Sequence, residues 1–260
     1  MTNNHWAIEK KILLQLSLEE KRKFYQIKDF VTIWSVDPWC NFVVRNKNIK
    51  VQKPTIDDIT EYRKLKSNPS LDQALTEKVS IYTGDITKLE VDAIVNPANY
   101  MLRAGSGLDE KIHRAAGPLL QEECDTLGVC PTGEARITGG YNLPAKYVIH
   151  TVGPQDGSAT KLESCYKKCL SLYQQEDHRI NSFAFPVIFT GKYGFPNRLA
   201  AHIALRSARI FLETHQHIIR IFFCVHKEID VNIYLTLLHM YFPVQEWNYD
   251  VEDKVTSYVE

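Results

Sequence analysis

The stretch from Tyr82 to Asn99, which reads YTGDITKLEVDAIVNPAN, decides the fold that the sequence predicts. It contains the run Asp92–Val95 and begins at the end of the run Lys78–Tyr82. Both runs are short, apolar and rich in β-branched residues, and turn-forming residues follow each of them, which is typical of buried β-strands. We therefore predict two strands here.

The same kind of run recurs along the chain and alternates with segments of helical pattern. Further strands are predicted at Tyr147–Thr151, Phe183–Ile188 and Ile218–Val225. Helices are predicted at Leu108–Leu127, Lys161–Gln175, Arg198–Thr214 and Asp230–Tyr241. Such alternation favours a layered α/β domain whose central strands are largely parallel.

The segment before this domain has a different pattern. Ile8–Phe30 has a helical pattern, interrupted by a capping box in which Ser17 caps and Glu20 reaches back. Val36–Pro69 is charged and contains three prolines, so we expect an irregular arm and linker. Three aromatic residues in or beside it predict that part of it packs on the main domain: Trp34, Trp39 and Phe42.

These patterns divide the chain into three parts. Residues 1–76 are a helical extension and linker, residues 77–243 the α/β domain, and residues 244–260 an acidic tail.

The composition excludes few classes but narrows the choice. The 31 Lys and Arg residues balance 31 Asp and Glu residues, which argues against a general binder of nucleic acid or membrane surfaces. No apolar run approaches the roughly 18 residues of a membrane span. Because Met1–Lys10 is polar, we expect no secretory signal and a cytoplasmic or nuclear location.

The six cysteines form no CxxC pair. Zinc would need further ligands at familiar spacing, so we favour free buried thiols and expect no metal site.

Small and polar residues follow several predicted strands. They are Gly84 and Asp85, Asn96 and Asn99, Gly153, and Thr190 and Gly191. In open α/β sheets ligands bind beyond the carboxyl ends of strands, so these loops should converge on one crevice. Their amide, hydroxyl, carboxylate and backbone groups suit a nucleotide-like ligand.

Two glycine-containing loops join strands to helices. Ala104–Asp109 precedes a helix, where exposed N–H groups and the helix dipole favour an anion. It is neither a P-loop nor GxGxxG, because Glu110 occupies the last glycine position. Phe189–Pro196 is the second loop. Together they could hold a pyrophosphate from both sides, although each alone is more typical of an ordinary turn.

A polar cluster combines Asn96 and Asn99 with Asp109 and His113. Asp109 and His113 are four residues apart and share a helix face. On the residues alone, a turn-forming asparagine, a capping aspartate and a core histidine are the simpler interpretation.

Long motifs in a fixed order then point to one family. Tyr82–Asn99, Ile112–Pro118, Thr132–Tyr141 and Leu143–Pro154 resemble macrodomains, and most of all the MacroD type of mono-ADP-ribosyl hydrolases. The resemblance covers residues 77–243, and the helical extension is similar to that of the subgroup. It implies a three-layer α/β/α sandwich around a mixed, centrally parallel sheet, with an N-terminal helical extension.

The resemblance also implies roles for individual residues around ADP-ribose. Asp85 would accept a hydrogen bond from the adenine amino group beside the Ile86 backbone. The diphosphate would lie between two loops, Gly105, Ser106, Gly107 and Leu108 in one, and Thr190, Gly191, Lys192 and Tyr193 in the other.

Around the distal ribose, the resemblance places the polar cluster. Asn99 and Asp109 would face that sugar, with Tyr193 packed on it. Asn96 would support the loop, and His113 would shape the pocket behind Asp109.

The sequence departs from the family pattern at several positions. Ala104 and Ser106 stand where the subgroup has glycines, and Pro97 replaces a common alanine. His226 follows the last predicted strand, where relatives often carry a phenylalanine that stacks on adenine.

The function implied is removal of mono-ADP-ribose from acidic side chains of proteins, with O-acetyl-ADP-ribose as a second substrate. Asp109 would orient the ribose and share the activation of water with the substrate diphosphate. A non-catalytic ADP-ribose reader remains the main alternative, and binding of a nucleic-acid terminal phosphate a lesser one. We expect a monomer with no cofactor and no metal, whose partners are ADP-ribose and mono-ADP-ribosylated proteins, and nucleic acid only through ADP-ribosylated ends.

Overall fold

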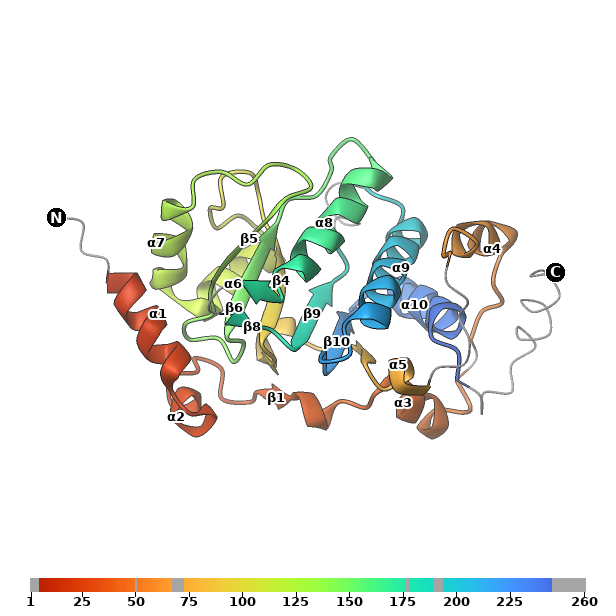
Figure 1. The fold of residues 1–260 in the computed structure, drawn as a ribbon, viewed down its shortest axis with the longest axis horizontal. Coiled ribbons are helices and arrows are strands. Elements are labelled where there is room, and N and C mark those ends of the chain that lie inside the picture. The colour runs from red at the N-terminus through yellow and green to blue at the C-terminus, as the bar shows by residue number, and fades with distance from the viewer. Residues whose placement is uncertain (1–4, 50, 67–72, 176–177, 189–193, 245–260) are drawn as a thin grey trace.

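The computed structural model describes residues 5–49, 51–66, 73–175, 178–188 and 194–244. Its centre is a six-stranded sheet in the order β2-β10-β9-β4-β6-β5 (Figure 1). The strands are β2 (Val79–Tyr82), β4 (Ala93–Pro97), β5 (Ala135–Gly139), β6 (Tyr147–Thr151), β9 (Ser182–Pro186) and β10 (Arg220–Cys224). Neighbouring strands run parallel except β5, which pairs antiparallel with β6. The mixed, centrally parallel sheet is therefore confirmed.

Helices cover both faces of this sheet. They are α6 (Leu108–Ala116), α7 (Pro118–Thr126), α8 (Ala159–Ser171), α9 (Asn197–Thr214) and α10 (Glu228–Tyr241). Buried residues of α8, α9 and α10 form one hydrophobic core, and those of α6 and α7 form the other. The three-layer sandwich is confirmed.

Successive side chains of a central strand point alternately into these two cores. Ala93 and Val95 of β4 belong to the core of α8–α10, whereas Ile94 between them belongs to the core of α6 and α7. Successive side chains of a strand point to opposite faces, so a strand buried on both faces consists of an unbroken apolar run. A polar residue within such a run therefore needs a polar partner in the core that it faces.

The predicted helix Leu108–Leu127 is wrong as a single element. The structure ends α6 at Ala116 and starts α7 at Pro118. Gly117, at φ 87°, separates them in a conformation that favours glycine, and proline at the first position of α7 cannot continue the preceding helix. The antiparallel edge strand β5 is an element that the sequence analysis missed.

The N-terminal segment also has more order than predicted. Its elements are α1 (His5–Gln15), α2 (Leu18–Arg22), β1 (Val31–Thr32), η1 (Ile33–Ser35), α3 (Trp39–Arg45), α4 (Ile56–Tyr62) and α5 (Gln73–Thr76). The capping box of Ser17 and Glu20 is confirmed at α2. The irregular arm predicted at Val36–Pro69 is wrong where α3 and α4 form, the latter with its own capping box of Thr55 and Asp58.

This segment follows one side of the sheet, from α1 beside α7 to α3 and α5 at the far end (Figure 1). Trp39 is fully buried, and its indole N–H donates to the Phe242 carbonyl oxygen at 2.9 Å. Phe42 packs on the same core, whereas Trp34 is 75% exposed, so its predicted packing is wrong.

The remaining short elements are η2 (Ile86–Lys88), β3 (Leu89–Glu90), β7 (Gln174–Gln175) and β8 (His178–Arg179).

All six cysteines are buried and unbridged, as predicted. Within the described ranges, no helix has the length and apolar character that a membrane crossing requires.

Candidate active site

The order of the strands reverses between β4 and β9. After β4 the chain builds β6 and β5 on one side, and after α8 it returns to β9 on the other side of β4. Loops that leave neighbouring strands in opposite directions open a space at the carboxyl end of the sheet. The candidate residues after β4 lie at this reversal.

Asp109 lies in the first turn of α6 and is only 5% exposed. Its Oδ1 accepts from Asn96 Nδ2 at 2.6 Å, and its Oδ2 accepts from the Gly105 N–H at 2.8 Å. His113 Nε2 lies 3.4 Å from Oδ1, one turn further along the helix. Both carboxylate oxygens are therefore held in a fixed orientation.

The surroundings of Asp109 keep it ionised. Burial raises the pKa of its carboxyl, but the His113 and Asn96 side chains and the Gly105 N–H outweigh burial and lower it. The N-terminus of α6 also favours a negative charge. Asp109 is thus a carboxylate at neutral pH, and it is a weak base.

The Asn99 side chain holds its own loop. Its Oδ1 accepts from the backbone N–H groups of Met101 and Arg103, each at 3.2 Å, and its Nδ2 donates to the Arg103 carbonyl. Asn99 is half-buried and lies next to Gly105, where an added Cβ would meet its Nδ2 at 3.4 Å and Asp109 Oδ2 at 3.0 Å. The loop, the glycine and the carboxylate form one tightly packed unit.

The first predicted phosphate loop is open to solvent. Gly105, Ser106 and Gly107 are exposed, and Leu108 begins α6. The first N–H groups of a helix lack partners within it and point out from its end, which is an arrangement that binds phosphate. The second predicted loop, Thr190, Gly191, Lys192 and Tyr193, lies outside the described residues.

Asp85 and His226 follow β2 and β10, which lie on the side of β9 away from β4. Their strands β2 and β10 are parallel neighbours, and the Val225 N–H donates to the Tyr82 carbonyl at 2.9 Å, which brings the two loops side by side. Asp85 Oδ1 accepts from the N–H and hydroxyl of Thr87, so the carboxylate fixes the turn that buries Ile86. His226 is exposed.

His150 is a polar residue of this site that the sequence analysis missed. It is fully buried in β6, where its Nδ1 lies 3.1 Å from Asn96 Nδ2. The available signal was a histidine inside the apolar run Tyr147–Thr151, because a polar side chain there must have a partner.

One group of potential metal ligands lies in the same place. Single donor atoms of His113, Cys124 and His150 lie within 4.8 Å of one another. The His150 ring nitrogens both have hydrogen-bonding partners already, Asn96 at Nδ1 and Thr138 at Nε2. These side chains therefore fit a hydrogen-bonded core better than a metal centre.

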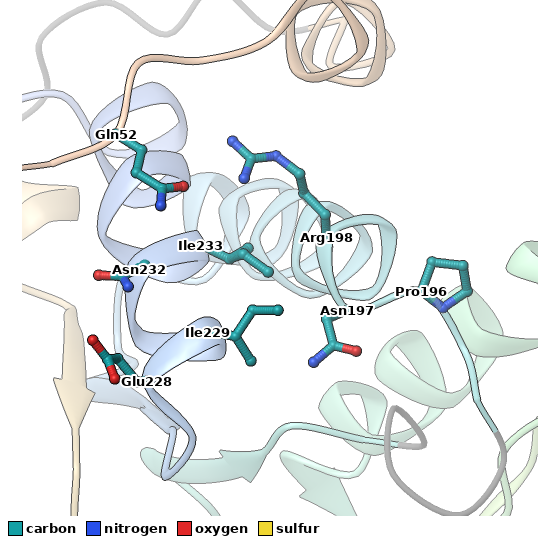
Figure 2. A pocket seen from close by; sticks show the side chains of 8 residues that line it. All are labelled: Gln52, Pro196, Asn197, Arg198, Glu228, Ile229, Asn232 and Ile233. Carbon is teal, nitrogen blue, oxygen red and sulfur yellow. The ribbon is translucent and has the colours of Figure 1, made fainter.

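Two cavities open beside helices of the main domain. One of about 310 Å³ is lined by Asp85 and Thr87 together with Lys111 and Arg114 of α6. The other, of about 680 Å³, lies between the first turns of α9 and α10, where Ile229 and Ile233 face Asn197 and Arg198 (Figure 2). The lining of this second cavity includes no predicted site residue.

Comparisons with known proteins agree with this geometry. A family model of the Macro domain matches residues 95–204. ADP-ribose glycohydrolase MACROD1 of Bos taurus is 45% identical over 250 residues, which cover 94% of this chain and 72% of the bovine protein. ADP-ribose glycohydrolase MACROD2 of Homo sapiens is 45% identical over 255 residues, and the match spans 57% of its length.

Solved structures of macrodomains are also similar to this chain. The Trypanosoma brucei macrodomain in complex with ADP has a TM-score of 0.71 at 32% identity, and the match covers 91% of each chain. The same macrodomain in complex with ADP-ribose has a TM-score of 0.66. Since both the sequence match to MACROD1 and this structural match extend over nearly the whole chain, the protein belongs to the macro domain family.

Proposed function

We propose that the protein is an ADP-ribose hydrolase that removes mono-ADP-ribose from acidic side chains of modified proteins. The observation that carries the proposal is Asp109, a buried carboxylate fixed at both oxygens in the first turn of a helix, the kind of helix end that favours phosphate. The glycohydrolase names of MACROD1 and MACROD2 support the reaction class. A reader would need the phosphate loop, but it would not need a buried carboxylate held in this way.

The reaction breaks the bond between the anomeric carbon of the distal ribose and a carboxylate oxygen. The sugar becomes cation-like as the bond breaks, so the fixed anion of Asp109 stabilises it and orients a water molecule. Water attacks the anomeric carbon, the side-chain carboxylate leaves with the bonding electrons, and the extra proton passes to the diphosphate or Asp109. Because a carboxylate is a good leaving group, no strong general acid is required.

Positioning supplies much of the rate in this mechanism. The helix end of α6 and the loop Gly105–Leu108 would hold the diphosphate, and Asp85 with the Ile86 backbone would hold adenine. Holding reacting groups in register contributes several kcal/mol, up to about 7–11 in ideal cases. The acetyl ester of O-acetyl-ADP-ribose lies on the same ribose, so we include it as a second substrate.

The test is a time course of ADP-ribose release from a protein mono-ADP-ribosylated on glutamate. Asp109→Ala should lower the rate at least about 100-fold, while calorimetry should still detect binding of free ADP-ribose. Glu110→Gln, a change at the exposed neighbour on α6, serves as the matched control and should retain the wild-type rate. Wild-type turnover by Asp109→Ala would refute the proposal.

A further inference from the structure

Asp109 is the last member of a line of hydrogen bonds that crosses the sheet behind the site. Asn96 Nδ2 lies 2.6 Å from Asp109 Oδ1 and 3.1 Å from His150 Nδ1. On the far side of the imidazole, His150 Nε2 lies 2.9 Å from Thr138 Oγ1. The line therefore joins the helix α6 to three strands of the sheet.

The strand register creates this line. Asn96 and His150 are direct partners in the parallel pair β4–β6, so they share one face of the sheet. Thr138 of β5 faces the same way, since it pairs with Val148, two residues before His150. This is the face that α6 and α7 cover, which brings Asp109 above Asn96.

Hydrogen-bonding chemistry fixes the direction of each step. The Asn96 amide must present nitrogen, not oxygen, to the Asp109 carboxylate, because a carboxylate only accepts. The second hydrogen of the same nitrogen then points at His150 Nδ1, which accepts it. The proton of the neutral ring consequently lies on Nε2. Two groups face this nitrogen, the Thr138 hydroxyl at 2.9 Å and Cys124 Sγ of α7 at 3.7 Å, and the nearer hydroxyl accepts the proton.

Burial maintains this state. His150, Asn96 and Thr138 are all fully buried. Burial, assisted by repulsion from His113 and opposed by Asp109, lowers the pKa of His150 to about 3. A neutral imidazole with one acceptor and one donor is therefore present throughout the physiological range. Glu123 of α7 is turned away, since it binds Lys10, the Gly139 N–H and the Tyr141 hydroxyl.

We infer that His150 is a positioning residue of the hydrolase: its Nδ1 locks the Asn96 amide, and the amide in turn holds the Asp109 carboxylate in its working orientation. The inference rests on the proposed role of Asp109. A side chain that is free to rotate loses much of its catalytic value, because misplacement by about 1 Å can reduce a rate about 100-fold.

A matched pair of variants tests this role. In His150→Asn the amide oxygen takes the place of Nδ1 and can still accept from Asn96, whereas His150→Leu has nearly the same shape and cannot. We expect His150→Leu to lower kcat about 10- to 100-fold while the Kd for ADP-ribose stays within about twofold. His150→Asn should restore most of the rate. Equal loss in both variants, or a parallel loss of affinity, would overturn the inference.

A double variant asks whether His150 acts through Asp109. The residual rate of Asp109→Asn should not fall further when His150→Leu is added, because residues of one network are not additive. A further loss of the full single-variant size would show an independent role and contradict the inference.

Nuclear magnetic resonance of the wild-type imidazole nitrogens tests the geometry without any activity. The spectrum should show an unprotonated Nδ1 and a protonated Nε2 from pH 5 to 8. The opposite tautomer would overturn the inference even if the protein hydrolyses ADP-ribosyl esters. The expected tautomer in an inactive protein would refute the proposed function, and with it the catalytic role of His150, while the hydrogen-bonded line itself would stand. One equivalent of zinc bound by the wild type and lost in His150→Asn would also overturn it, in favour of a metal centre with His113 and Cys124.

Discussion

Gly105 shows how closely the residues of the site are fitted. Its N–H donates to Asp109 Oδ2, and a Cβ added to it would crowd both that carboxylate and the Asn99 amide. The neighbouring Ala104 and Ser106, by contrast, are exposed, and their side chains replace the glycines of the family pattern where there is room for them. A named contact therefore disfavours any side chain at Gly105, and a positive φ of 69° separately favours glycine at Gly107.

Gly105→Ala should lower the hydrolysis rate. The new methyl group would lie 3.0 Å from Asp109 Oδ2 and 3.4 Å from Asn99 Nδ2, so the carboxylate or the loop must shift. A displacement of a few tenths of an ångström should reduce kcat about 10-fold, by the sensitivity to position already invoked. Steady-state kinetics beside Glu110→Gln, the exposed change on α6 that also controls for Asp109→Ala, would check this; equal rates for both variants would contradict it.

The pH dependence of the reaction follows from the lowered pKa of Asp109. A carboxyl whose pKa is lowered stays ionised as the pH falls past the ordinary aspartate range, and it is protonated only below that range. We expect kcat to stay level from pH 8 to 5. In Asn96→Ala one of the causes of the lowering is removed, so the acid limb should move to higher pH. A wild-type limb near pH 6 in a pH–rate profile would argue that another group controls the rate.

The residues of the site differ in how far the sequence could predict them. The four-residue spacing of Asp109 and His113 is enough to place both on one face of α6. The pairing of Asn96 with Asp109 and His150 is not predictable in this way, because it depends on the register of β4 against β6. The loop Thr190–Tyr193 stays a prediction from the sequence.

At the scale of elements, ion pairs fasten the linker helix α4 to α9. Asp58 is fully buried and binds Arg198 through two contacts of 2.5 and 2.6 Å, His202 at 3.0 Å and the Thr55 N–H at 2.6 Å. One carboxylate thus caps a helix and joins two elements that are 140 residues apart.

Asp58→Asn should destabilise the fold by about 3 kcal/mol, because it leaves Arg198 and His202 without their anion. Burial raises the pKa of Asp58, but its hydrogen bonds with His202, Arg198 and Thr55 lower it well below the usual range. This stability is present above the pKa of the unfolded chain and is lost as the pH falls towards that of the folded state. The difference between the free energies of unfolding of wild type and Asp58→Asn should therefore become smaller below about pH 4.

Urea unfolding at pH 7 and pH 3 measures both effects. Asp57→Asn, one residue earlier on the exposed side of α4, is the control and should change stability by less than about 0.5 kcal/mol. A cost for Asp58→Asn that is independent of pH would contradict the ionic explanation.

Elements were predictable where one pattern decided them. The five parallel strands lie on runs that are apolar on both faces, and the structure confirms each within a few residues. The edge strand β5 was missed because its alternate residues are polar and its partner is β6, further along the chain. Gly117 and Pro118 were a signal for the break between α6 and α7. The helical spacing of apolar residues continues across them, however, and favoured a single helix.

At the scale of the whole molecule, the N-terminal arm, residues 5–30, neutralises carboxylates of the main domain. Lys10 binds Glu123 at 2.5 Å, and Arg22 binds Glu90 through two contacts of 2.8 Å. Lys21 of α2 is buried and donates to three carbonyl oxygens, those of Leu143, Pro144 and Ala145.

Lys10→Met should destabilise the protein by about 2 kcal/mol, because it removes a charged partner from the buried Glu123. For a chain of this size the melting temperature should fall by about 4–8 °C. Lys11→Met changes an exposed neighbour on α1 and is the control in a thermal scan. Equal melting temperatures for the two variants would show that the contact with Glu123 contributes little.

The contacts of Lys21 also set an order of events during synthesis. Its three acceptors lie 122, 123 and 124 residues further along the chain. When the arm leaves the ribosome, neither its ammonium groups nor the apolar side chain of Leu13 has anything to bind. The arm therefore docks only after the turn before β6 has emerged, so a segment made ahead of the main domain is fixed in place only after much of that domain exists.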